Sequence, residues 1–175
     1  MKDLTIICND AGYPNIGVGR LIHLGKVSTL IASHIGLNKD VATLMKEEKI
    51  NVVLIPQGTL AERIRAFGSG LGGVLTPTGF HTIAAKDKQI IEVEGRPYVL
   101  ETALGADLAL IEGYKSDDLG NLTYDKTARN FNPIMATAAE MVVAQVSQKV
   151  PVIDPECVLT PHIYIDALTL EVPHE

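Results

Sequence analysis

Amide and hydroxyl side chains follow three apolar segments, and these residues are the first candidates for binding chemistry. Asn9 follows residues 4–8 (LTIIC), Ser33 follows residues 27–32 (VSTLIA), and Gln57 comes shortly after residues 51–55 (NVVLI). Open α/β sheets bind ligands at the carboxyl ends of their strands, so all three could line one crevice. Alternatively, they end the strands by hydrogen bonding to backbone groups. The pattern leaves both interpretations open for Asn9 and Gln57 and favours the structural one for Ser33.

A glycine-rich loop at residues 68–73 (GSGLGG) matches the dinucleotide-binding pattern G-x-G-x-x-G. That pattern must follow a strand and open a helix, so that a phosphate meets the helix N-terminus. Here it follows a predicted helix and precedes an apolar segment that ends at residues 76–79 (TPTG). We therefore interpret it as a flexible or tightly turning loop rather than a nucleotide cradle.

The helix before this loop is predicted over residues 60–67. Thr59 is placed to act as its N-cap, and Glu62 completes a capping-box pattern. Leu60, Ile64 and Phe67 recur at helical spacing and are expected to form the buried side.

The histidines and cysteines do not predict a metal site or a nucleophile. No histidine has a second ligand at i+3 or i+4, and the five are scattered: His23, His34, His81, His162 and His174. Cys8 lies in an apolar segment, as a buried thiol does, and two cysteines make no disulfide framework. There is no G-x-S-x-G elbow, and neither cysteine has a visible histidine partner.

Composition narrows the class of protein further. A chain of 175 residues suits one domain, and its net charge of −6 argues against a nucleic-acid surface. Tryptophan is absent and aromatic residues make up 5%, so base-stacking platforms are not expected. No apolar run reaches the roughly 18–20 residues of a membrane span, and no signal peptide is evident. We expect a cytoplasmic protein that binds neither nucleic acid nor membrane.

The first half of the chain alternates between predicted strands and helices. Strands are expected over residues 4–8, 27–32 and 51–55, and helices over residues 20–24, 39–48 and 60–67. Asn38 is expected to cap the second helix. Apolar strands without alternation, separated by helices, indicate right-handed crossovers and a parallel sheet. The predicted fold is therefore α/β, an open, mostly parallel sheet flanked by helices.

The second half adds an antiparallel hairpin and further strands. Residues 90–93 and 98–100 flank the turn Glu94-Gly95-Arg96, and Pro97 suggests an edge strand. Further elements are expected as a strand over 106–113, a turn over 117–121, a helix over 134–140, a strand over 141–146, and short strands over 163–165 and 168–170.

Several long runs of this sequence resemble the α subunit of the family I CoA-transferases. They are CNDAG, ASHIG, PQGTLAERIRAFGSGLGG, LTPTG, ADLALI, DLGNLTY and TARNFNP, and the likeness extends from Asp3 to about Asp166. The greatest likeness is to the 3-oxoacid and the acetate/butyrate–acetoacetate enzymes. The fold that this implies is shared with sugar-phosphate isomerases.

The resemblance implies an enzyme that moves coenzyme A from an acyl-CoA to a free short-chain carboxylic acid by covalent, ping-pong catalysis. The nucleophile is a glutamate in a Ser-Glu-Asn-Gly motif of the β subunit. This sequence lacks that motif, so none of its own residues is assigned a catalytic role. The implied partner is a β subunit, most simply in an α2β2 complex. Coenzyme A is implied as a substrate, with no metal and no nucleotide cofactor.

The resemblance also implies roles for particular residues. Asn9 and Gln57 would point their amides into the acid pocket. Gly58, a substrate-binding residue with them, would let the backbone approach coenzyme A or the partner. Residues 127–133 (TARNFNP) would have a structural or subunit-contact role. Backbone approach to coenzyme A or to the partner would be allowed by Gly70, Gly72 and Gly73.

The sequence departs from the family pattern at its start. The family's α subunit begins with a further β-α unit whose loop, Gly-Gly-Phe-x-x-x-Gly-x-Pro, supplies oxyanion donors. The resemblance therefore implies that residues 1–175 are one α-subunit domain without the first β-α unit. One alternative is a truncated paralogue or fragment that only binds a partner chain. Another is an unrelated enzyme on the same scaffold, such as a sugar-phosphate isomerase, which would need a phosphate-binding cluster that the strand ends lack.

Overall fold

The computed structural model describes residues 2–171 and consists of two compact units. Of the described residues, the first unit comprises 2–60 and 75–101, and the second comprises 61–74 and 102–171. The prediction of a single domain over residues 1–175 stays a prediction.

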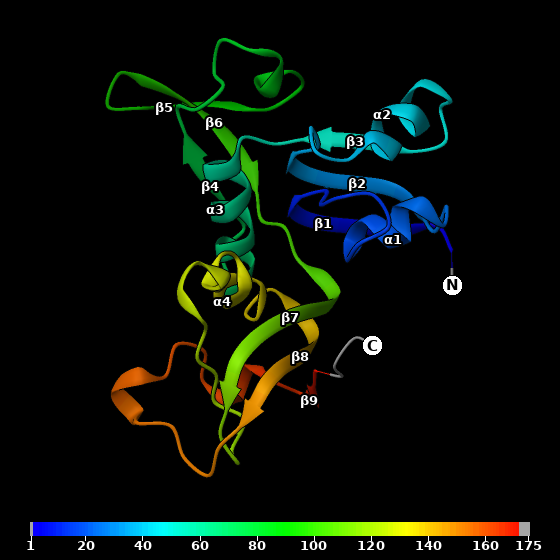
Figure 1. Ribbon diagram of the computed structural model, residues 1–175. Helices are drawn as coiled ribbons and strands as arrows, with labels where there is room; N and C mark the ends of the chain where they lie inside the picture. The colour runs from blue at the N-terminus through cyan, green and yellow to red at the C-terminus, as the bar shows by residue number, and fades with distance from the viewer. Residues whose placement is uncertain (1, 172–175) are drawn as a thin grey trace. The chain divides into compact units, whose positions relative to one another are not determined.

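The first unit contains the parallel sheet that the sequence predicts. Its strands β1 (Leu4–Asp10), β2 (Val27–His34) and β3 (Asn51–Leu54) are parallel and adjacent in chain order (Figure 1). Helices α1 (Val18–His23) and α2 (Lys39–Lys46) lie in the two crossovers. β1 and β2 each run two residues further than expected, so Asn9 and Ser33 belong to the strands rather than following them.

Apolar packing of the helices against the central strand holds this sheet in place. Leu30 and Ala32 of β2 are fully buried, as are Ile22 of α1 and Val41 of α2. Asn38 caps α2 as predicted, because its Oδ1 accepts a hydrogen bond from the Asp40 amide at 3.1 Å. This core fixes the positions of β1, β2 and β3, and therefore the place where their carboxyl ends lie.

Helix α3 (Gln57–Gly68) begins earlier than predicted. The Leu60 amide donates to the Pro56 carbonyl at 2.9 Å, so Thr59 lies in the first turn and the predicted capping box is wrong. Leu60 and Ile64 are buried as expected. Phe67 is 45% exposed, and its prediction as a core residue is wrong; its ring lies against Gly105 instead.

The predicted hairpin is confirmed, but the prediction that Pro97 lies in an edge strand is wrong. Strands β5 (Ile90–Val93) and β6 (Arg96–Thr102) pair antiparallel, and β4 (Gly73–Thr76) joins them in the order β4–β6–β5. A short 3₁₀ helix, η1 (Ile83–Ala85), precedes β5. Pro97 therefore lies in the central strand, where it is the second residue of β6 and pairs with Glu92. At the start of a strand, the missing amide hydrogen of proline is tolerated.

The second unit contains another parallel sheet, in the order β7–β8–β9. Its strands are β7 (Ala106–Ser116), β8 (Ala139–Lys149) and β9 (Ala167–Leu170), and helix α4 (Asn132–Met135) precedes β8. The core between them is built from Ile111, Leu122, Ala136, Val142, Ala144 and Val146. The other helical turns are η2 (Lys126–Arg129), η3 (Pro155–Cys157) and η4 (His162–Tyr164).

Two predictions in the second unit are wrong. The helix expected over residues 134–140 ends at Met135, because the Ala106 amide bonds to the Ala138 carbonyl at 3.0 Å and β8 begins at the next residue. The strand expected over residues 163–165 is mostly the turn η4, in which the Tyr164 amide donates to the Pro161 carbonyl at 3.2 Å. The turn at residues 117–121 is confirmed, with Asp117 Oδ1 accepting three backbone amides.

Candidate functional site

The carboxyl edge of the sheet β1–β2–β3 brings together three of the predicted binding residues. Cys8 is level with Ala32, and Ala32 is level with Leu54, so Asn9 and Ser33 lie at corresponding positions near the ends of their strands. Gln57 follows β3 and opens α3. All of these residues belong to the first unit. Because the strands are parallel, Asn9 and Gln57 lie at the same edge, on either side of β2.

The two carboxamides differ from the serine in their hydrogen bonding. Ser33 Oγ donates to the Asn9 carbonyl at 2.5 Å, which is the structural role that the sequence favours for this residue. Within residues 2–171, the side chains of Asn9 and Gln57 make no hydrogen bond. Asn9 is half-buried and Gln57 is exposed. Both amides are therefore available to a ligand at this edge.

A histidine and an aspartate at the same edge were not identified from the sequence as site residues. Asp10 of β1 pairs in register with His34 of β2, and Asp10 Oδ2 lies 2.6 Å from His34 Nδ1. Asp10 Oδ1 accepts the Gly12 amide at 2.6 Å. Parallel pairing of the first two predicted strands is the signal that could have found this contact.

The thiol of Cys8 lies one residue before the candidate amide Asn9. Burial, with a further contribution from the charge of Asp10, raises the pKa of Cys8 to about 12. A thiol with this pKa stays protonated near neutral pH and is a poor nucleophile. Cys8 is half-buried and packs against the core of the first unit, so the prediction of a buried thiol holds only in part.

Three of the four predicted glycines have open surroundings. Gly58 lies in the first turn of α3, and a Cβ added there would have no neighbour within 4 Å. The same holds for Gly70 and Gly72, which lie in the second unit between α3 and β4. Gly70 has φ +70°, a conformation that favours glycine, and Gly73 is the first residue of β4. No packing contact requires a glycine at Gly58 or Gly72, so their backbones can be approached closely.

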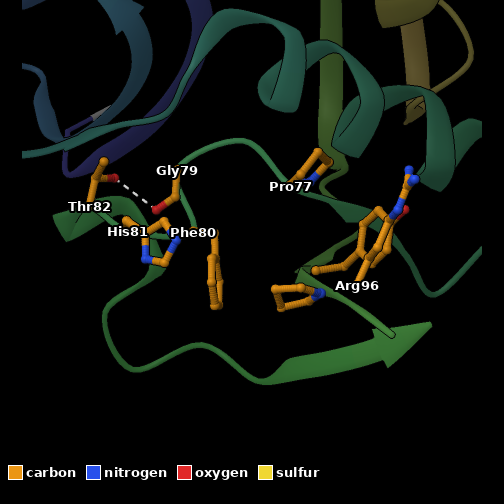
Figure 2. A pocket seen from close by; sticks show the side chains of 8 residues that line it. Pro77, Gly79, Phe80, His81, Thr82 and Arg96 are labelled. Carbon is orange, nitrogen blue, oxygen red and sulfur yellow. Dashed lines mark hydrogen bonds between the residues drawn. The ribbon is translucent and has the colours of Figure 1, made fainter. Parts of the chain in front are cut away.

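A separate pocket of about 550 Å³ lies in the first unit beside β6 (Figure 2). Its walls include Phe80, His81, Arg96 and Tyr98, and the rings of Phe80 and His81 have centroids 4.3 Å apart. Thr82 Oγ1 donates to the Gly79 carbonyl at 2.9 Å, as the dashed line in Figure 2 shows. The pocket offers apolar rings and one permanent positive charge, and no predicted site residue lines it.

Neither a metal cluster nor a membrane span is found in the part of the chain that the structure describes. Among residues 2–171, no three His, Cys, Asp or Glu side chains are grouped as metal ligands would be, and His174 lies outside these residues. No helix within the same residues is long and apolar enough to cross a membrane.

Comparison with known proteins decides the family. The coenzyme A transferase family model matches residues 1–171. The chain belongs to the coenzyme A transferase family. It is 50% identical to the probable coenzyme A transferase alpha subunit of Bacillus subtilis over 171 residues. These residues cover 96% of this chain and 75% of the relative.

A further relative agrees with this membership, and a solved structure shares the fold. The acetoacetyl-CoA:acetate/butyrate CoA transferase alpha subunit of Clostridium acetobutylicum is 47% identical over 173 residues, covering 98% of this chain and 79% of that one. The acyl-CoA transferase YdiF of Escherichia coli O157:H7, in a thioester complex with CoA, has the same fold. Its TM-score is 0.85 at 21% identity, covering 98% of this chain and 38% of that chain. The sequence-based assignment to the α subunit of this family is confirmed.

Proposed function

We propose that this chain is the α subunit of an enzyme that transfers coenzyme A from an acyl-CoA to a free short-chain carboxylic or 3-oxocarboxylic acid. In this proposal, a β subunit carries the catalytic glutamate, and two copies of each chain form the enzyme. Family membership and relatives named as alpha subunits support the proposal.

The proposed chemistry needs a carboxylate nucleophile. It also needs hydrogen-bond donors that bind first the acid released from the acyl-CoA and then the acid that receives coenzyme A. The glutamate oxygen attacks the thioester carbon, the C–S bond breaks, and an acyl-glutamyl anhydride and a CoA thiolate form. The thiolate then attacks the glutamyl carbon and releases the first acid, which leaves a glutamyl-CoA thioester. The second acid reverses these steps and leaves as the new acyl-CoA.

The observation that carries the proposal is the pair of unpaired carboxamides at one sheet edge. The NH₂ groups of Asn9 and Gln57 can donate to a substrate carboxylate, which accepts up to four hydrogen bonds. We propose that Gly58 keeps the start of α3 open beside them. We propose further that the backbone at Gly70, Gly72 and Gly73 meets coenzyme A or the β subunit; a Cβ at Gly70 or Gly72 would have no neighbour within 4 Å.

Co-expression with a β subunit that contains Ser-Glu-Asn-Gly tests this function. We expect one complex in gel filtration and transfer of CoA between acids when a panel of acyl-CoAs and free acids is assayed. Two species that do not associate would contradict the proposal. A complex without transfer would instead support the alternative that the chain only binds a partner.

Gln57→Ala tests the assigned binding edge. We expect about a tenfold higher KM for the acid with unchanged thermal stability, because one hydrogen bond to a charged group is lost. Gln89→Ala is the matched control, since Gln89 is exposed in the same unit and its carbonyl accepts the Leu100 amide of β6, which belongs to the other sheet. Equal kinetics in both variants would remove Gln57 from the binding site.

A further inference from the structure

One wall of the pocket beside β6 is a loop after β4 that its own hydrogen bonds hold in shape. The Phe80 amide donates to the Pro77 carbonyl at 3.3 Å, and the Thr82 amide donates to the Gly79 carbonyl at 2.9 Å. Thr82 Oγ1 donates to the same carbonyl at 2.9 Å and accepts the Ala84 amide at 3.2 Å. Gly79 has φ +80°, a conformation that favours glycine. The loop therefore fixes the position of the Phe80 ring before any ligand binds.

A second wall is the first part of β6. Arg96 and Tyr98 are two residues apart in this strand, so their side chains leave the same face of the sheet. β6 is the central strand of its sheet, and Val99, which follows Tyr98, is fully buried. This wall is therefore fixed as well. Figure 2 shows open space between the ring of Phe80 and Arg96.

Arg96 gives the pocket a permanent positive charge. Within the described residues 2–171, its guanidinium makes no hydrogen bond or ion pair, and the residue is exposed. Of the described residues that line the pocket, none is Asp or Glu. A guanidinium pairs well with a carboxylate or a phosphate, because each accepts two parallel hydrogen bonds from it. The pocket is therefore suited to an anionic ligand.

The size and the aromatic walls of the pocket narrow the class of ligand. Its volume of about 550 Å³ lies in the range of small-molecule pockets, about 300–1,000 Å³. A short-chain acid would fill little of this space, and an uncharged apolar ligand would leave Arg96 without a partner. A purine has flat faces that pack against Phe80 and Tyr98, and a phosphate on its sugar suits Arg96. The few aromatic residues of this chain argue against a nucleic-acid surface, but a single nucleotide needs only one such pocket.

We propose that this pocket binds a purine nucleotide, with the base against Phe80 and Tyr98 and the phosphate on Arg96. The phosphorylated adenosine end of coenzyme A and a free adenine nucleotide share this chemistry. The inference does not rest on the proposed function, because no predicted site residue lines the pocket and nucleotide binding is measured without CoA transfer.

Calorimetric titration of the full chain with AMP and with adenosine tests the inference. We expect saturable binding of AMP and about tenfold weaker binding of adenosine, because adenosine has no phosphate for Arg96. Arg96→Gln should weaken AMP binding about tenfold and leave adenosine binding unchanged. Arg20→Gln is the matched control, since Arg20 is exposed on α1 in the same unit and does not line the pocket. No saturable binding of AMP or CoA, or equal AMP affinities in the two variants, would overturn the inference.

Phe80→Leu tests the contact with the base separately from the charge. It should weaken the binding of AMP and adenosine alike, by about fivefold or more, because stacking on the ring is lost. Phe67→Leu is the control, since Phe67 is 45% exposed and does not line the pocket. Circular dichroism checks that each variant is folded. Unchanged affinities for both ligands in folded Phe80→Leu would contradict the proposed stacking.

Titration with coenzyme A separates the two sources of the nucleotide. If CoA binds at least about tenfold more tightly than AMP, and Arg96→Gln weakens both, the pocket holds the adenosine end of CoA. If AMP and ADP bind as tightly as CoA, the ligand is a free nucleotide. CoA transfer by the complex with the β subunit is measured in parallel. Transfer without nucleotide binding to this pocket would overturn this inference alone, whereas nucleotide binding without transfer would contradict only the proposed function.

Discussion

The Nζ atom of Lys88 lies 2.6 Å from Oε1 of Glu101, whose side chain is only 3% exposed. Lys88 lies in the segment between η1 and β5, whereas Glu101 is in β6. This ion pair therefore holds the short segment between η1 and β5 against β6. Removing a cation from a buried carboxylate costs more than the loss of an exposed pair.

Lys88→Met should lower the free energy of unfolding by about 2 kcal/mol, because one charge-assisted hydrogen bond to the buried Glu101 carboxylate is lost. Urea unfolding followed by circular dichroism measures this change. Lys126→Met is the control, since Lys126 and its partner Asp125 are 83% and 53% exposed. Its expected effect is below about 0.5 kcal/mol. Equal stabilities of the two variants would contradict the account of the buried pair.

Asn38 should contribute strongly to the stability of the first unit. It is 2% exposed, its Nδ2 donates to the Ala11 carbonyl at 2.9 Å, and its Oδ1 caps α2. Asn38→Ala removes both bonds and should lower the free energy of unfolding by about 2–3 kcal/mol. Asn51→Ala, at an exposed strand residue, should change it little. A similar small change in both variants would show that the buried amide bonds are not important.

The raised pKa of Cys8 predicts slow alkylation and a loss of stability at alkaline pH. At pH 8, iodoacetamide should label exposed Cys157 much faster than Cys8, as measured by peptide mass mapping. The folded protein holds the protonated thiol more tightly than the unfolded chain does. The contribution of the Cys8 thiol to the free energy of unfolding is therefore fully present below pH 9, the ordinary cysteine pKa. It is lost as the pH rises from about 9 to about 12.

Cys8→Ala serves as the reference for this pH dependence. Its stability should fall less than that of the wild type between pH 9 and pH 11, because the coupled thiol is absent. Rapid labelling of Cys8 at pH 8, in protein that remains folded, would be incompatible with a half-buried thiol that stays protonated at this pH.

Two glycines near the end of α3 should respond differently to substitution. A Cβ on Gly68 would clash with Oγ1 of Thr137, whereas one on Gly72 would meet nothing within 4 Å. Gly68→Ala should therefore lower the free energy of unfolding by about 1–3 kcal/mol, and Gly72→Ala by much less. If coenzyme A or the β subunit approaches the backbone at Gly72, Gly72→Ala should reduce CoA transfer without loss of stability. Full activity in a stable Gly72→Ala complex would remove Gly72 from the proposed contact.

The parallel sheets and the hairpin could be predicted because their signals are local. The apolar segments LTIIC, VSTLIA and NVVLI, separated by helical patterns, indicate buried parallel strands, and Glu94-Gly95-Arg96 indicates a tight turn. Where local and tertiary preferences compete, the prediction was wrong. The alanines around residue 138 favour a helix, but pairing of Ala106 with Ala139 makes a strand there.

The candidate site could be predicted only in part. Asn9 and Gln57 were recognisable because each comes near the end of a predicted strand. The Asp10–His34 contact depends on the register between β1 and β2, which the sequence does not specify. Likewise, only the fold shows that Ser33 bonds to backbone while the Asn9 amide stays unpaired.

The central claim is that this chain supplies the polar edge of a site whose nucleophile comes from another chain. Its most direct test measures CoA transfer by this chain without its partner, by the isolated β subunit, and by the two together at equal concentration. We predict transfer only in the mixture, and loss of that transfer when the β-subunit glutamate of Ser-Glu-Asn-Gly is changed to glutamine. Transfer at the full rate by the unaccompanied chain would contradict the account.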